Sequence, residues 1–245
     1  MPFLIDTMAH FEIDATTIGI KMDRFDAWNT IKGLSKEGFE KKMEKSCLSK
    51  DRKDLLFKFI QGEIEVSYTC RHDIEAYALK CLASCFYSTI SFERHQYSSC
   101  ELYEYDPPKN GHNIIKHGIG FGEVVSYSRN FGTLKVAIPN EKNGDKERHA
   151  ILSDLYLKPG RDKLELGPPD SREINCTISI ASLTDGKFRF ISARVLSSKK
   201  KKYEKTIAQA IGKIIRDEQT RQGVINRCVE ILERDLNPGL RRDRS

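Results

Sequence analysis

The stretch EINCTISIASLTDGKFRFISARVLSSKKKKYEK, residues 173–205, decides the fold. Its first part alternates apolar and polar residues, which is the pattern of a strand with one buried face. Thr184-Asp-Gly186 favours a tight turn, and residues 187–196 return as a second strand. Ser197 and Ser198 then offer N-caps for a segment in which isoleucines recur at helical spacing. The stretch predicts a β-hairpin followed by an amphipathic helix.

Upstream of the hairpin, the pattern predicts several short elements. Helices are expected to begin at Asp23, Ser35 and Ser49, each of which precedes apolar residues at helical spacing, and a longer helix is expected after Asp73. Alternating or apolar runs predict strands at residues 11–13, 17–22, 64–68, 86–92, 101–105, 123–127 and 133–138. Residues 150–157 are ambiguous between a short helix and a strand.

These elements predict an α+β fold: a helix-rich N-terminal part followed by a mainly antiparallel β part closed by C-terminal helices. Two prolines and a glycine meet in Asp106-Pro-Pro-Lys-Asn-Gly111, which is the predicted boundary between domains at residues 1–106 and 112–245. The polar residues 216–223 are expected to separate the first C-terminal helix from a second apolar segment, Val224 to Leu236.

The positive charge of the chain is local. The formal net charge is +6, from 41 Lys and Arg against 35 Asp and Glu. Residues 199–205 alone hold five lysines and one glutamate, a net charge of +4, which leaves +2 for the rest of the chain. Such a distribution is typical of a contact surface for a polyanion and not of a generally cationic protein.

Composition also narrows the class of protein. Hydrophobic residues make up 39% of the chain, enough for a packed core, which argues against global disorder. No apolar run approaches the roughly 18 residues that a transmembrane helix needs, and the N-terminus does not resemble a signal peptide. The seven cysteines are odd in number and widely spaced, as expected for free thiols in a reducing compartment. We therefore expect an intracellular protein, cytoplasmic or nuclear.

Three other kinds of site are weak in this sequence. Cys70, His72, Cys81, Cys85, His95 and Cys100 match no common zinc spacing. The glycines of His117-Gly-Ile-Gly-Phe-Gly122 precede a predicted strand, and a phosphate-binding loop needs a helix there. No nucleophile elbow, zinc-protease helix or Walker lysine is present. We predict no metal, no cofactor and no catalytic residues.

The lysines at residues 199–205 carry the functional prediction. Lysine in the first turn of a helix opposes the helix macrodipole, at a cost of about 0.3–1 kcal/mol for a well-placed charge. Bound phosphate groups would relieve this repulsion and release counterions. A run of four lysines is also typical of a nuclear import signal, or simply of a solvated helix face.

Residues 150–216 resemble a double-stranded RNA-binding domain. That family runs helix, three antiparallel strands, helix, with Gly-Pro after the first strand and a basic cluster opening the last helix. Here Leu164-Glu-Leu166 precedes Gly167-Pro168, the hairpin follows, and Lys201, Lys202 and Lys205 fall on the Lys-Lys-x-x-Lys positions. The resemblance implies lysines on phosphates across the major groove, and a loop near Arg172 in the minor groove. It also requires residues 150–157 to be the first helix, and Pro169 and Asp170 replace the family's loop histidine.

Two functional hypotheses follow. The first is non-catalytic binding of RNA, with duplex RNA read by shape. Its predicted contact residues are Lys199, Lys200, Lys201, Lys202, Lys205, Arg172 and Arg194. The second is a scaffold or matrix-type assembly protein, with a viral origin as one option. It would place the same lysines on an anionic surface and self-associate through the apolar face of Val224 to Leu236.

Overall fold

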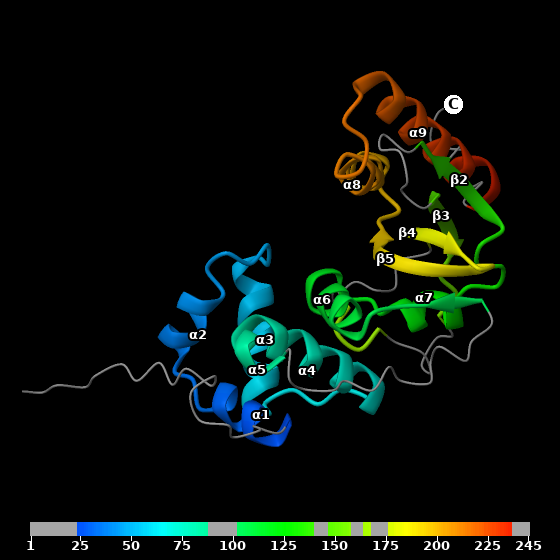
Figure 1. Ribbon diagram of the computed structural model, residues 1–245. Coiled ribbons are helices and arrows are strands. Elements are labelled where there is room, and N and C mark those ends of the chain that lie inside the picture. The colour runs from blue at the N-terminus through cyan, green and yellow to red at the C-terminus, as the bar shows by residue number, and fades with distance from the viewer. Residues whose placement is uncertain (1–23, 88–101, 140–146, 158–163, 168–175, 237–245) are drawn as a thin grey trace, which may run out of the picture.

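The protein folds into two lobes (Figure 1). The structure, a computed structural model, describes residues 24–87, 102–139, 147–157, 164–167 and 176–236. The first lobe is helical, and the second is a five-stranded sheet with helices on both faces. The predicted α+β class and its helix-first order are therefore confirmed.

The N-terminal lobe is built from short amphipathic helices. They are α1 (Arg24–Lys32), α2 (Lys36–Lys42), α3 (Lys50–Gln61), α4 (Tyr68–Leu82) and α5 (Ser84–Tyr87). Ser35 and Ser49 are the N-caps of α2 and α3, and the Ser35 hydroxyl accepts a hydrogen bond from the Gly38 amide at 3.1 Å. All three helices predicted between residues 23 and 61 are thus present.

Helix α6 (Pro107–His117) joins the two lobes. It begins in the proline-rich stretch that we interpreted as a boundary, because proline fits the first turn of a helix, where its missing N–H is not needed. The helix crosses α4 so closely that a Cβ on Gly111 would lie 2.0 Å from the Asp73 carbonyl oxygen. On the other lobe, the Asn113 side chain donates to the Ala193 carbonyl at 3.0 Å and accepts from the Ala193 amide at 2.9 Å.

The sheet has the strand order β1-β5-β4-β3-β2. Its strands are β1 (Tyr103–Glu104), β2 (Leu134–Ile138), β3 (Arg148–Asp154), β4 (Cys176–Thr184) and β5 (Lys187–Leu196). Only β1 is parallel to its neighbour, and the other pairs are antiparallel. Asp185 and Gly186 both have positive φ, 49° and 76°, so they form the tight turn predicted between β4 and β5.

Alternation along the strands divides the core of this lobe into two layers. One face packs on α8 (Lys200–Ile211), α9 (Glu218–Ile231) and the π-helical turn η3 (Leu232–Leu236). The opposite face packs on α7 (Phe121–Tyr127), where the rings of Phe121 and Phe190 stack with centroids 4.8 Å apart. The loop between the end of α8 and α9 spans residues 212–217, which is shorter than the break we predicted.

Several strand predictions differ from the structure or lie outside the described residues. Residues 123–127 form α7 and not a strand, because Phe121 and Val124 at helical spacing are both buried and Gly120 caps the helix. Of the strand predicted at residues 64–68, residues 64–67 are irregular and Tyr68 begins α4. Phe86 and Tyr87 lie in α5, while residues 88–92, like the strands predicted at 11–13 and 17–22, lie outside the described residues. The ambiguous residues 150–157 supply most of β3, where the family resemblance requires a helix.

Candidate nucleic-acid interface

Five lysines open helix α8 and form what we call the lysine cluster: Lys199, Lys200, Lys201, Lys202 and Lys205. All five are exposed. Tyr203 and Ile207, on the buried face of the helix, are completely buried and pack the helix against the sheet. The Tyr203 hydroxyl also donates a hydrogen bond of 2.7 Å to Glu233 in η3. The helix start is therefore anchored through its apolar face, and the lysines project into solvent.

The five lysines are not equivalent. Lys200 Nζ lies 3.0 Å from a carboxylate oxygen of Glu233 and 3.5 Å from one of Glu204, so its charge is already neutralised. Within the described part of the chain, the other four have no carboxylate within 4.0 Å. Lys201 and Lys205 are four residues apart and therefore share one face of the helix. The effective contact set for a polyanion is Lys199, Lys201, Lys202 and Lys205.

The two arginines predicted as contacts are placed differently. Arg172 lies outside the described residues. Arg194 is only 8% exposed, because its position on β5 turns the side chain under α8, where Nη2 approaches the Gln209 carbonyl at 3.5 Å. Because α8 covers most of this side chain, Arg194 adds no exposed charge to the lysine cluster, and its contact with nucleic acid stays a prediction. Its Nε has no hydrogen-bond partner among the described residues.

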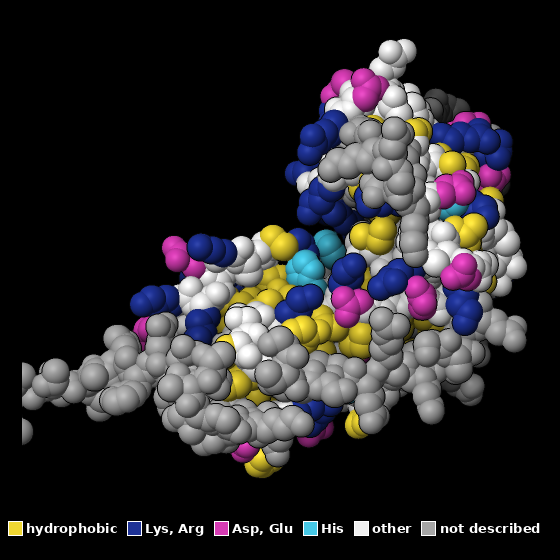
Figure 2. Space-filling view, in the orientation of Figure 1, with side chains coloured by type: hydrophobic (Ala, Val, Ile, Leu, Met, Phe, Trp, Pro, Cys, Tyr) yellow, Lys and Arg dark blue, Asp and Glu magenta, His cyan; other side chains and the backbone are white. Residues whose placement is uncertain are grey.

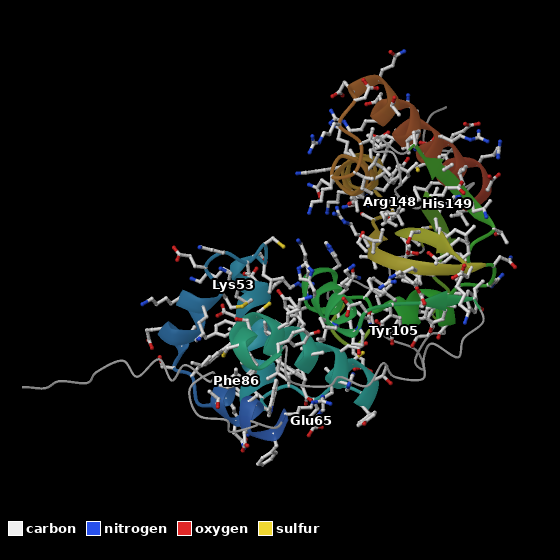
Figure 3. The ribbon with its side chains drawn as sticks, viewed as in Figure 1. Lys53, Glu65, Phe86, Tyr105, Arg148 and His149 are labelled. Atoms are coloured by element: carbon white, nitrogen blue, oxygen red, sulfur yellow. The ribbon has the colours of Figure 1, made fainter. Side chains whose placement is uncertain are left out.

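A second group of side chains, in which two lysines and an arginine surround a cysteine and two histidines, lies in the recess between the lobes. Figure 2 shows histidines at the base of this recess and Lys and Arg beside them. We call this group the basic notch: Cys47, His112, Lys116, His117, Arg194 and Lys213. Lys116 Nζ lies 2.9 Å from the Cys47 sulfur, and His112 Nε2 lies 3.5 Å from the same atom. Figure 3 shows nitrogen-tipped side chains of both lobes pointing into this recess.

Burial and like charge act together on the histidines of the notch. The pKa of His112 is lowered to about 4, first by burial and then by the charges of Lys116 and Lys213. The pKa of His117 is lowered to about 3 by burial and by the charges of Arg194, Lys116 and Lys213. Both imidazoles are therefore neutral at pH 7, and the fixed positive charge of the notch resides on Lys116, Lys213 and Arg194.

Sequence reasoning missed the basic notch. Cys47 precedes His112 and Lys116 by 65 and 69 positions, and Lys213 lies about a hundred residues further on. Each of these residues is unremarkable in its own stretch of sequence. Only the crossing of α6 between the lobes brings them together, so no local pattern could have identified them.

The pocket beside α7 is a further concave site. It has a volume of about 320 Å³, and its lining includes Tyr105, Glu123 and Glu165. Tyr105 lies on the α7 side of the sheet in Figure 3. The pKa of Glu123 is raised to about 7 by burial and by the charge of Glu165. The Glu123 carboxylate accepts a hydrogen bond of 2.5 Å from the Gly120 amide and so caps the N-terminus of α7.

The cysteine and histidine residues and the glycine stretch do not form the metal or phosphate sites considered for them among the described residues. Within the described residues, no three His, Cys, Asp or Glu side chains gather as a metal site would require. The buried His72 pairs instead with Asp73, at 3.2 Å between Nδ1 and Oδ1. His95 and Cys100 lie outside the described residues. The glycine stretch 117–122 does precede a helix, but Glu123 already occupies the N-terminus of that helix.

No protein-family model, no curated protein and no solved structure matches this chain. Within the described residues, no helix combines the length and apolarity required to cross a membrane.

Proposed function

We propose that this protein binds RNA, preferentially duplex RNA, through the lysine cluster, without catalysing a reaction on it. The observation that carries the proposal is the exposure of four unneutralised lysines on the first two turns of one anchored helix. Phosphate groups would neutralise both these charges and the positive end of the α8 macrodipole. Affinity would then come mainly from counterion release.

The arrangement of the lysines supports reading of shape and not of sequence. They are long, flexible donors on one helix, suited to phosphate oxygens and not to the fixed patterns of base edges. Of the element order of the family that residues 150–216 resemble, the chain has the last two strands and the last helix, as β4, β5 and α8; the expected first helix is β3, and residues 164–166 form a turn and not a strand. In duplex RNA the base edges of the major groove are inaccessible to side chains, so contacts across it are made to phosphates.

The alternative, a scaffold that assembles through Val224 to Leu236, loses its predicted contact face. The apolar side chains of that segment are buried against the strands and α8 of the same chain; they are Val224, Ile225, Cys228, Ile231 and Leu232. Self-association through this face would require the sheet lobe to open. The lysine cluster alone could still bind an anionic membrane surface, so the test below includes one.

The direct test removes the charge of the effective contact set with Lys199→Gln, Lys201→Gln, Lys202→Gln and Lys205→Gln combined. We expect affinity for a duplex RNA to fall at least about 100-fold near 0.1 M salt, since each neutralised phosphate contributes a factor of about 8 there. Fluorescence anisotropy with labelled duplex RNA, duplex DNA and anionic vesicles measures this. Tighter binding of duplex RNA than of the other two by the unchanged protein is the expected order.

A matched control removes the same charge elsewhere. Lys32, Lys41, Lys42 and Lys58 are exposed lysines of the helical lobe, and their combined change to Gln should leave RNA affinity within about twofold of the original. Equal affinity of the cluster variant and the unchanged protein would refute the proposal. Equal losses in both variants would show a response to net charge alone and would refute it as well. Vesicle binding without RNA binding would favour the membrane alternative.

A further inference from the structure

Cys47 has surroundings unlike those of the other thiols that the structure describes. Burial raises the pKa of Cys70, Cys176 and Cys228 to about 12 in each case, and these thiols stay protonated. Cys47 is exposed, in the loop between α2 and α3. Its sulfur is the acceptor of a 2.9 Å contact from the Lys116 ammonium, and His112 approaches it at 3.5 Å.

These neighbours favour the thiolate. Burial alone raises the pKa of Cys47, but the hydrogen bond from Lys116 and the charges of Lys116 and Lys213 outweigh it, so the pKa lies below its ordinary value. A lysine ammonium next to an accessible sulfur is one of the surroundings in which protein thiols become nucleophilic. The thiol of Cys81, on α4, shows the opposite result: burial raises its pKa.

A second observation concerns the buried guanidinium of the notch, whose Nη2 lies 3.5 Å from the Gln209 carbonyl. Arg194 is more than nine-tenths buried, its Nε has no hydrogen-bond partner among the described residues, and its charge is felt at His117. Neither Lys116 nor Lys213 has a carboxylate within 4.0 Å in the described part of the chain. A cationic recess of this kind concentrates small anions from solution.

We propose that Cys47 is a nucleophilic thiol that forms mixed disulfides with small anionic disulfides of the glutathione type, which the cations of the basic notch attract. The Cys47 thiolate attacks one sulfur of the incoming disulfide. A bond forms between Cys47 and that sulfur, the original S–S bond breaks, and the second half leaves as a thiolate that takes its proton from water. Two electrons pass from the protein thiol to the departing half, so no other oxidant is required. This proposal does not depend on RNA binding.

The test compares disulfide reagents of opposite charge. The full-length protein is reacted at pH 7 and low salt with 5,5′-dithiobis(2-nitrobenzoate), which is anionic, and with cystamine, which is cationic. Mass spectrometry of the peptides then gives the rate at each cysteine. Cys85, exposed on α5, serves as the internal reference. After division by the Cys85 rates, we expect Cys47 to prefer the anionic reagent on the order of tenfold.

Variants separate the role of each cation. Lys116→Gln should shift the pH profile of Cys47 alkylation by neutral iodoacetamide to higher pH, and Lys116→Arg should restore most of it. Lys213→Gln should reduce the preference for the anionic reagent, while Lys109→Gln, on the exposed outer part of α6, should leave it unchanged. Circular dichroism confirms that each variant is folded.

Three results would overturn the proposal. One is a Cys47 rate no greater than that of Cys85. Another is equal relative reactivity toward the anionic and cationic reagents. The last is an alkylation profile unaffected by Lys116→Gln in a folded protein. None of these bears on the RNA assay, so the two proposals fail separately.

Discussion

The lysine cluster and the basic notch are both cationic, but they differ in their access to water. The lysines of the cluster come from one helix turn and its successor, and they project into solvent. The cations of the notch come from α6, β5 and the chain after α8, and the notch residues other than Cys47 and Lys213 are partly or fully buried. Solvent screens the first group and screens the second much less.

This difference decides what each group can do. In the cluster, the charges are exposed and remain available for a partner that brings many negative charges. In the notch, burial together with the neighbouring positive charges lowers the pKa of His112 and His117, and the charges of Lys116 and Lys213 lower the pKa of Cys47 against the effect of burial. Exposed positive charge therefore favours binding of a polyanion, and desolvated positive charge favours altered reactivity of the residues beside it.

The largest expected effect is a difference in salt dependence. Four phosphate contacts with a slope of about −0.9 each predict that affinity for duplex RNA falls about 100-fold between about 50 and 200 mM salt. The alkylation profile of Cys47 should shift little over the same range, because the Lys116 ammonium is in direct contact with the sulfur. Anisotropy and iodoacetamide kinetics at both salt concentrations measure this. Parallel salt dependence of the two quantities would remove the distinction between the regions.

A smaller effect is expected in acid. His112 and His117 have pKa values of about 4 and about 3 in the folded protein, below the value of about 6.5 for an unfolded chain. The unfolded state therefore binds more protons below pH 6.5, and the free energy of unfolding falls as the pH drops from 6.5 toward 4. Combined His112→Gln and His117→Gln should weaken this pH dependence, on the order of 1 kcal/mol between pH 7 and pH 5 after allowance for screening.

Urea unfolding at the two pH values measures the effect, and the comparison is between variant and unchanged protein at each pH. Glu123 acts in the opposite direction, because its pKa of about 7 exceeds the unfolded value. Its contribution is present below pH 4.5 and is lost as the pH rises toward 7. Both proteins contain Glu123, so its contribution cancels when their free energies of unfolding are compared at the same pH. An identical pH dependence in the two would show that the notch histidines are solvated.

Sequence reasoning succeeded where the determinants are local. The serine caps of α2 and α3, the Asp185-Gly186 turn and the isoleucine spacing of α8 each specify their element within a few residues. It failed at residues 123–127, where five residues are too few to separate a strand from a helix. There the tertiary contact of Phe121 with Phe190 decides.

The candidate sites follow the same rule. The lysine cluster is contiguous, so the sequence located it, but the neutralisation of Lys200 depends on Glu233, 33 residues away. Arg194 is a predicted contact residue, but its place on a strand does not indicate that α8 covers the side chain. The contacts of Cys47 span more than sixty positions, so no local sequence pattern indicates them. The position of α6 between the lobes brings these residues together.

The smallest expected effect concerns stability. If the lysine cluster serves a ligand and not the fold, its charge should oppose folding slightly. Lysines in the first turn of α8 repel one another and the positive end of the helix dipole, so the combined Gln variant should gain stability, by less than about 1 kcal/mol in total because solvent screens these exposed charges. Lys200 is left in place, because its pairs with Glu204 and Glu233 stabilise the helix start. A rise in the urea midpoint together with loss of RNA affinity is the expected signature. A fall in the midpoint would indicate that the lysines support the fold, and the loss of binding would then have a structural cause.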